Sequence, residues 1–298
     1  MARYLGIDLG ATNIKSVVLE VGADPTVVDI DRTPTRGDEG HDAVLERLIG
    51  LSLAKHRELG PVAGIGIGTP GLVDPVTGVV DIFTNLPGQW RGVPIRDRLE
   101  AALPVPVTLI NDARAFTLAE GRMGAGKGAS VVVCMTLGTG IGGGIMIDGH
   151  LHLGATGIAG EIAHQTVLPD GPACGCGNPG CAEGLARSDV LAARAGRDTV
   201  EEVFAGVAVG DQRCIEAVAH AANYLGIALG NAVTLLGPDR IVIGGGIIAA
   251  GDALLDPIRE ATRRRVTLVP HEDIHIVAAA LGSEAGAIGA ALAAADTG

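Results

Sequence analysis

The chain has 298 residues and a formal net charge of −12, from 22 Lys and Arg against 34 Asp and Glu. This charge repels nucleic-acid phosphates and anionic membrane surfaces, and three Phe, one Trp and two Tyr are too few for a base-stacking platform. A hydrophobic share of 47% with 19% charged residues excludes a disordered chain. The length suits two lobes with a cleft between them.

No secretory signal is visible, because the start MARYLGIDLG lacks a basic region, an apolar run and a cleavage site. The most apolar stretch, Val131–Ile147, is interrupted by Gly138-Thr139-Gly140, so it predicts a pair of strands rather than a membrane helix. We therefore expect a cytoplasmic protein without a membrane partner, in which the five Cys are reduced.

The first half of the chain alternates apolar strands with helical periodicity. The predicted strands are Leu5–Leu9, Lys15–Glu20, Val62–Gly68 and Val105–Ile110. The predicted helices are Asp38–Leu59, Ile95–Leu103 and Ala113–Gly121, and a long loop spans Asp74–Pro94.

The second half repeats this alternation around an irregular stretch at Gly149–Cys181. Its predicted strands are Ser130–Leu137, Gly144–Ile147, Arg240–Ile243 and Ile274–Ala278. Its predicted helices are Asp189–Gly196, Val200–Val207, Asp211–Leu236, Ala253–Arg264 and Glu284–Ala294. Because a strand, a Gly loop and a second strand open each half, we expect two similar α/β lobes.

Three Gly-rich segments are candidates for phosphate binding. They are Asp8–Lys15, Leu137–Gly144 and Ile243–Gly246. None is a P-loop, and the G-x-G-x-x-G letters at Gly138–Gly143 lie between two strands, which disfavours a dinucleotide fold. Gly permits backbone conformations in which successive N–H groups converge on an anion, and Asp8 could hold Mg²⁺ through water. Each loop alone could equally be a tight hairpin, but three together favour a nucleoside triphosphate.

Four potential metal ligands lie close together in the irregular stretch. His164, Cys174, Cys176 and Cys181 form the pattern H-x9-C-x-C-x4-C. One imidazole and three thiolates are typical of a closed structural Zn²⁺ site. The alternatives are disulfides, which a reducing compartment disfavours, or a turn without function. A knuckle of this kind would also hold Glu161 and Glu183 rigidly, as carboxylates that accept from sugar hydroxyls, although ordinary loop solvation is the alternative.

Asn111 and Asp112 lie where a predicted strand meets a helix. Ligand clefts in open α/β sheets lie at the carboxyl ends of strands, so Asp112 is a candidate base. Helix capping is the simpler explanation from position alone.

Together these segments resemble the ROK family of sugar kinases and related repressors, within the actin/hexokinase-like ATPase superfamily. Asp8–Lys15 looks like the first phosphate motif, Leu137–Gly144 like the second, and Ile243–Gly246 like the adenosine motif. Asn111-Asp112-Ala113 looks like the catalytic NDA. The segment Cys174–Glu183 fits CxCGxxGCxE, and ExGH is represented by Glu161-Ile162-Ala163-His164, with Ala in place of Gly.

The resemblance implies an α/β fold of two actin-like, ribonuclease-H-like lobes with the ligand cleft between them. It implies that Mg²⁺-ATP contacts Asp8, Gly10, Ala11, Thr12, Asn13, Lys15, Gly138, Thr139, Gly140, Gly244, Gly245 and Gly246. It implies that a hexose contacts Gly71, Asn85, Asn111, Asp112, Glu161, His164 and Glu183. Asp112 would accept the proton of the sugar 6-hydroxyl as that oxygen attacks the γ-phosphorus.

The resemblance therefore implies an ATP-dependent hexose kinase, with glucose as the first choice of sugar. N-acetylmannosamine, N-acetylglucosamine, fructose or allose are alternative substrates, and polyphosphate is an alternative donor. A sugar-responsive regulator is disfavoured, because the first phosphate motif leaves no room for a preceding DNA-binding domain. We expect lobes at 1–112 plus 284–298 and at 113–283, and a homodimer or dimer of dimers.

Overall fold

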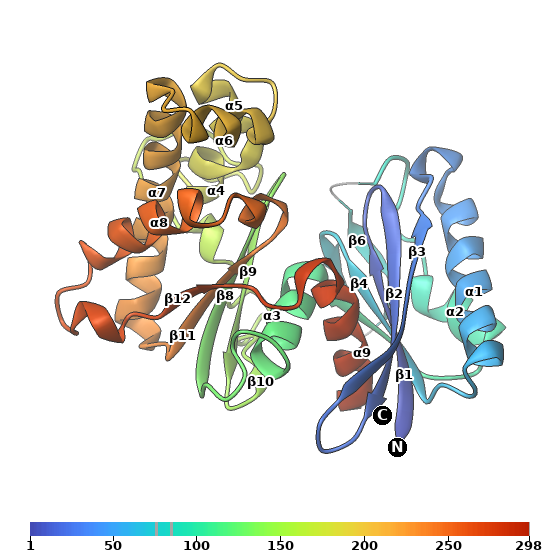
Figure 1. Ribbon diagram of the computed structural model, residues 1–298. Helices are drawn as coiled ribbons and strands as arrows, with labels where there is room; N and C mark the ends of the chain where they lie inside the picture. The colour runs from blue at the N-terminus through green and yellow to red at the C-terminus, as the bar shows by residue number, and fades with distance from the viewer. Residues whose placement is uncertain (75–76, 84–85, 298) are drawn as a thin grey trace. The chain divides into compact units, whose positions relative to one another are not determined.

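The computed structural model describes residues 1–74, 77–83 and 86–297 and divides into two compact units (Figure 1). Unit 1 comprises residues 1–119 and 281–298, and unit 2 comprises residues 120–280. The chain thus leaves unit 1 within helix α3 (Asp112–Arg122) and returns to it after strand β12 (Ile276–Ala278). The sequence predicts the first boundary after residue 112, at the start of α3, and the second after residue 283. In the structure the first boundary lies inside α3, after residue 119, and the second lies after residue 280.

Unit 1 is built on a five-stranded mixed sheet. Its strands are β1 (Ala2–Leu9), β2 (Asn13–Val21), β3 (Thr26–Pro34), β4 (Gly64–Thr69) and β7 (Val107–Asn111), with a separate small pair β5 (Leu72–Val73) and β6 (Val80–Ile82). The order across the sheet is β3-β2-β1-β4-β7. β1, β2 and β3 are antiparallel neighbours, whereas β1, β4 and β7 run parallel. The parallel strands therefore end at one edge, which carries Asp8 and Asn111.

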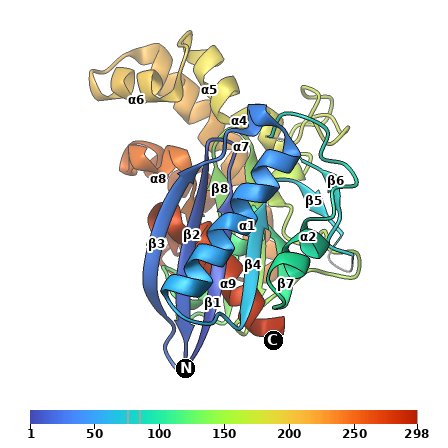
Figure 2. The ribbon, with the colours of Figure 1, turned by 90° about the vertical axis from the view of Figure 1, so that its right-hand side faces the viewer.

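Helices cover both faces of this sheet (Figures 1 and 2). Helices α1 (His41–Glu58) and α2 (Ile95–Ala102) lie on one face, where apolar side chains of both helices share a core with β1 and β4. Helix α9 (Ala285–Thr297) lies on the other face. It approaches at backbone distance, because a Cβ on Gly66 would fall 1.7 Å from the Ala290 carbonyl oxygen. The small side chains of α9 and the glycines of β4 together allow the helix to pack this closely against the sheet.

Strand β3 is absent from the sequence prediction. Its segment TVVDIDRTP carries two aspartates, a residue type that strands normally disfavour. In the structure both carboxylates pair with Lys55 of α1, at 2.7 Å from Asp29 and 3.3 Å from Asp31. The Lys55 side chain is 8% exposed, so these ion pairs tie α1 to the sheet edge.

Unit 2 contains a second five-stranded sheet. Its strands are β8 (Val131–Leu137), β9 (Ile141–Ile147), β10 (His150–Leu151), β11 (Arg240–Gly244) and β12, in the order β10-β9-β8-β11-β12. Its helices are α4 (Ala182–Ala186), α5 (Ser188–Ala195), α6 (Val200–Ala208), α7 (Gln212–Leu236) and α8 (Asp252–Arg263). Helix α7 begins where the Asp211 side chain accepts from the Arg213 and Cys214 N–H groups, and it ends at Gly237 in a left-handed conformation.

The two sheets repeat one topology. In each, a three-stranded antiparallel run is followed by two strands parallel to the first strand of the unit, which is β1 in unit 1 and β8 in unit 2. This repetition confirms the prediction of two similar α/β lobes. Over the described residues, no helix has both the length and the apolar character needed to cross a bilayer.

Candidate active site and metal centre

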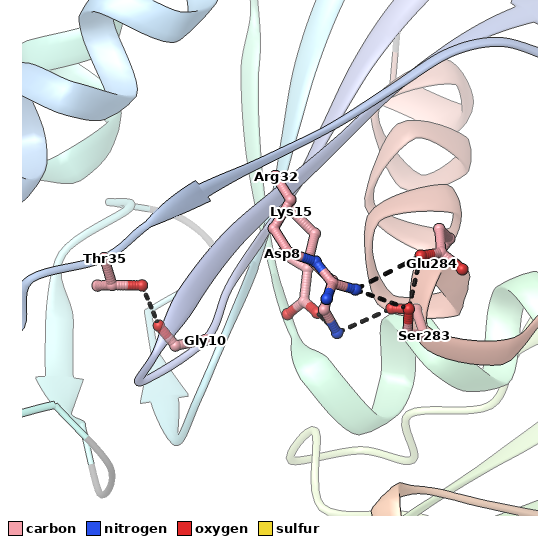
Figure 3. Close-up of polar contacts among 7 residues, drawn as sticks. All are labelled: Asp8, Gly10, Lys15, Arg32, Thr35, Ser283 and Glu284. Carbon is pink, nitrogen blue, oxygen red and sulfur yellow. Dashed lines mark hydrogen bonds and ion pairs between the residues drawn. The ribbon is translucent and has the colours of Figure 1, made fainter.

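The first Gly loop closes the hairpin between β1 and β2 in unit 1. The Gly10 N–H donates to the Asn13 carbonyl at 3.1 Å, and Thr35, which directly follows β3, braces the loop (Figure 3). The Thr35 hydroxyl donates to the Gly10 carbonyl at 2.6 Å, and the Thr35 N–H donates to the Thr12 carbonyl at 2.9 Å. Within the described part of the chain, the N–H groups of Ala11 and Thr12 have no acceptor, and both residues are exposed. The loop therefore presents amide donors suited to an anion.

Asp8 precedes this loop and lies directly opposite Lys15 in the β1–β2 register. The Lys15 ammonium lies 3.6 Å from Asp8 Oδ2 (Figure 3). Burial raises the pKa of Asp8 above its ordinary value, while Lys15 acts in the opposite direction. A carboxylate at this place offers a hard oxygen ligand of the kind that Mg²⁺ takes.

Asn111 and Asp112 form the junction between β7 and α3. The Asn111 Oδ1 accepts from the N–H groups of Ala113 at 3.1 Å and Arg114 at 3.2 Å. The Asp112 Oδ1 accepts from the Ala113 N–H at 2.8 Å and from the Asn111 side-chain amide at 3.1 Å. Asn111 thus caps the helix, so its start does not depend on Asp112 alone.

Gly71, another predicted sugar contact in unit 1, is hydrogen-bonded to Asn111 at the junction of β7 and α3. Its carbonyl accepts from the Asn111 side-chain amide at 3.2 Å. Asn85 lies outside the residues that the structure describes.

In unit 2 the second Gly loop lies between β8 and β9. The Gly138 carbonyl accepts from the Ser188 N–H at 3.1 Å, and the Gly138 N–H donates to the Gly140 carbonyl at 3.0 Å. β11 pairs with β8 so that Gly244 lies opposite Thr136. The predicted second phosphate motif and adenosine motif, Gly138–Gly140 and Gly244–Gly246, therefore extend from neighbouring strands of one sheet.

The four predicted metal ligands come together in unit 2. The donor atoms of His164, Cys174, Cys176 and Cys181 all lie within 4.8 Å of one another. His164 Nδ1 is 3.6 Å from the Cys174 sulfur, and the sulfurs of Cys176 and Cys181 are 3.6 Å apart. Tetrahedral zinc with ordinary bond lengths separates two sulfurs by about 3.8 Å and a sulfur from a nitrogen by about 3.6 Å. The cluster therefore fits a tetrahedral ion, and all five cysteines are unbridged, so the disulfide alternative is not realised.

The electrostatics of the thiols also favour a cation. Burial, reinforced by the neighbouring thiols, raises the pKa of Cys174 and Cys181. The Asn178 N–H lowers the pKa of Cys176. Three thiolates this close repel one another unless a divalent cation compensates them.

The metal cluster and the second Gly loop are joined through Glu183. Glu183 lies two residues after Cys181, in the first turn of α4, and its Oε2 accepts from the Ile141 N–H at 3.0 Å. Its Oε1 lies 3.5 Å from the Cys174 sulfur. Glu161 precedes the short 3-10 helix η2 (Ile162–His164) and is half-buried, and its neighbour Ala163 is fully buried.

The profile of the ROK family matches residues 4–297. The chain belongs to the ROK family. This ROK protein is 36% identical to the glucokinase of Halalkalibacterium halodurans, over 96% of this chain and 93% of the relative. It is 32% identical to the glucokinase of Streptomyces coelicolor, over 98% and 97% of the two chains.

Solved structures agree with this ROK assignment. The ROK hexokinase from Thermus thermophilus superimposes with a TM-score of 0.90 at 37% identity, covering 99% of this chain and 98% of that one. The ROK glucokinase from Streptomyces griseus, solved with glucose and AMPPNP, gives a TM-score of 0.82 at 30% identity over 99% and 100%. The predicted family and two-lobed α/β fold are therefore confirmed.

Several residues that brace the predicted loops were not predicted from the sequence. Thr35, in the segment after β3, supports Gly10, Ser188 supports Gly138, and the Ser283 carbonyl accepts from Lys15. Each is a common polar residue far from its partner along the chain. Only the fold reveals such contacts.

Proposed function

We propose that this ROK protein is an ATP-dependent hexose kinase that transfers the γ-phosphoryl group to the 6-hydroxyl of glucose. The observation that carries the proposal is the junction at Asn111 and Asp112. Because Asn111 supplies the cap of α3, a half-buried carboxylate at Asp112 can serve chemistry at the carboxyl end of β7. Similarity to two glucokinases over nearly the whole chain supports glucose as the acceptor.

In this mechanism Asp112 orients the sugar 6-hydroxyl and accepts its proton as the oxygen attacks phosphorus. A hydroxyl is a weak acid, so we expect proton transfer to be late and positioning to carry most of the rate enhancement. Asn111 and Gly71 support Asp112, and Glu161, His164 and Glu183 are the proposed sugar contacts in unit 2, with Asn85 as a further proposed contact.

The nucleotide is proposed to use the Gly loops of both units. The Ala11 and Thr12 N–H groups and the Thr139 and Gly140 segment would contact phosphates, and Gly244–Gly246 would lie against adenosine. When bound, Mg²⁺ would neutralise phosphate charge, and Asp8 is the residue proposed to hold it. Asn13 and Gly10 would shape the first loop.

The His164, Cys174, Cys176 and Cys181 cluster is proposed to hold structural Zn²⁺. His164 would then serve the metal through Nδ1, which lies beside the Cys174 sulfur. Because the ligands must stay reduced, this assignment accompanies a proposed cytoplasmic location. Formation of a homodimer or a dimer of dimers remains a prediction from the family, to be checked by light scattering.

The experiment is a coupled ADP-release assay with a panel of sugars and two donors. Glucose with ATP should give the highest kcat/KM, ahead of N-acetylmannosamine, N-acetylglucosamine, fructose and allose. Polyphosphate in place of ATP tests the alternative donor. Absence of turnover with every pair, in a protein that still binds a sugar, would instead support a sensory role such as that of the xylose repressor of Caldicellulosiruptor bescii, to which the chain is 27% identical.

A further inference from the structure

The segment where α9 begins is joined to the first phosphate motif by a compact polar cluster (Figure 3). The cluster consists of Asp8 in β1, Lys15 in β2, Arg32 in β3, and Ser283 and Glu284 of the 3-10 helix η5 (Gly282–Glu284). All five residues belong to unit 1. The cluster therefore joins three strands of the sheet to the turn that precedes α9.

Asp8 is confined within this cluster. On one side lies the Lys15 ammonium, which is its one ionic partner among the described residues. On the other side lies the first turn of α9, because a Cβ on Gly286 would fall 2.9 Å from Asp8 Cγ. The Asp8 side chain is only 18% exposed, so it has little freedom to find another counter-charge.

Lys15 holds two groups at once. Its ammonium donates to the Ser283 carbonyl at 2.9 Å and lies 3.6 Å from Asp8 Oδ2. The motif predicts Lys15 as a nucleotide contact, but in the structure its ammonium is engaged with Asp8 and Ser283. A cation shared in this way fixes the carboxylate relative to the start of α9.

Arg32 holds the same turn without contacting Asp8. It donates to the Ser283 hydroxyl at 3.1 Å and lies 3.8 Å from Glu284 Oε1, which also accepts from the Ser283 hydroxyl at 2.5 Å. Lys15 and Arg32 therefore share one anchoring function, but only Lys15 adds a contact with Asp8.

We propose that Lys15 is a positioning residue that fixes the Asp8 carboxylate and acts on the divalent cation of the nucleotide only through Asp8. This inference rests on the proposed kinase function, and it assigns Lys15 a role different from direct phosphate binding. Supporting residues around a metal ligand typically change metal affinity by about 10–100-fold when they are removed.

The test measures ADP binding by isothermal titration calorimetry, with Mg²⁺ and with EDTA, at one pH. The quantity of interest is the factor by which Mg²⁺ strengthens ADP binding. In Lys15→Met this factor should fall about tenfold, while ADP affinity in EDTA stays within about twofold of the wild type. Lys15→Arg keeps the cation and should restore most of the factor. In steady-state assays Lys15→Met should raise KM for ATP and leave KM for glucose unchanged.

Arg32→Met is the matched control. It removes the contacts with Ser283 and Glu284 and leaves the pair of Lys15 and Asp8 in place. Its melting temperature should fall at least as far as that of Lys15→Met, but Mg²⁺ should strengthen ADP binding as in the wild type.

Three outcomes would overturn the inference. Equal losses of ADP affinity with and without Mg²⁺ in Lys15→Met would show direct phosphate contact. An equal loss of the Mg²⁺ factor in Arg32→Met would show that only the turn matters. An unchanged Mg²⁺ factor in Lys15→Met, together with wild-type ADP affinity in EDTA, would remove any role for Lys15. A wild-type protein that binds no ADP with Mg²⁺ would instead contradict the proposed function itself.

Discussion

At the scale of single residues, Asn111 and Asp112 divide two roles between them at the junction of β7 and α3. Asn111 caps the helix, and Asp112 is the proposed general base. The Asn111 side chain accepts from two N–H groups of the first helical turn. Asp112 is the first residue of α3, but the helix keeps the Asn111 cap if the Asp112 charge is removed. Capping and catalysis can therefore be tested separately by substituting the two neighbours.

For Asp112→Asn we expect turnover to fall by about 10²–10⁴-fold, because the general base is lost. Glucose affinity and melting temperature should change little, because the amide keeps the size and one acceptor oxygen. Coupled ADP release and calorimetric glucose binding measure the two quantities. Near-normal turnover would contradict the role of Asp112.

The control is Asn111→Ala, which removes the cap of α3. Loss of a cap side chain typically lowers the free energy of unfolding by about 1 kcal/mol. We expect this variant to melt at a lower temperature than Asp112→Asn. The reverse order would mean that Asp112, and not Asn111, supports the start of the helix.

At the residue scale the sequence is most informative about the cysteines. Thiols at short spacing have few alternative uses in a reducing compartment, so the sequence predicts Cys174, Cys176 and Cys181 as ligands of one ion, and the structure brings their sulfurs together. Thr35 and Ser283 could not be predicted, because hydroxyl and carbonyl groups carry no signal until the fold brings them to Gly10 and Lys15.

At the scale of elements, the cluster of His164, Cys174, Cys176 and Cys181 lies in a region with little regular structure. The stretch from Gly149 to Cys181 contains only β10 and η2 as regular elements. A Cys3His zinc site would add to the few core side chains of this stretch, such as Ile162 and Ala163, and Glu183 would connect the site to the second Gly loop.

For Cys176→Ser we expect loss of the zinc and a weakened affinity for glucose, because Glu183 and His164 lose their common support. Atomic absorption should give one zinc per wild-type chain and markedly less in the variant. Cys214→Ala is the control, since this buried cysteine lies in α7, outside the cluster, and the variant should keep its zinc. A wild-type chain without zinc would contradict the assignment.

Helix α3 is fixed at its other end by Glu120, which is fully buried. Its carboxylate accepts from the Ala125 N–H at 2.8 Å and from the Ala280 N–H at 3.0 Å. These contacts join the last turn of α3 to the segment after β12, just before the chain returns to unit 1.

For Glu120→Leu we expect the free energy of unfolding to fall by about 2–4 kcal/mol, because two backbone N–H groups lose their buried acceptor. Glu120→Gln retains an acceptor oxygen and should lose less. Urea denaturation measures the difference between the variants. Equal stabilities for both variants would show that the hydrogen bonds contribute little.

At the scale of the whole molecule, the repeated sheet order explains why the sequence echo between the two halves was informative. Each half begins with a strand, a Gly loop and an antiparallel strand, and these local features are visible without a fold. The β3 edge of the first sheet was missed, since the charges of Asp29 and Asp31 conceal a strand until Lys55 of α1 pairs with them. Local patterns thus predict the Gly loops and the order of most elements, whereas β3 depends on long-range charge pairing that no local pattern reveals.

The function of the whole molecule as a kinase must also be distinguished from that of a sugar sensor, since some ROK relatives are xylose repressors. Xylose lacks the 6-hydroxymethyl group that the proposed reaction phosphorylates, so it is a matched probe for glucose.

At a concentration of 100 times its Kd, glucose should stabilise the wild-type protein by about 2.7 kcal/mol, measured as a shift in denaturant midpoint. Asp112→Asn should show nearly the same shift, because it keeps the sugar contacts while losing turnover. Xylose at the same concentration should stabilise the protein less and release no xylose phosphate. If xylose stabilises the chain as strongly as glucose and neither sugar is phosphorylated, the protein is a sensor and the catalytic role of Asp112 is wrong.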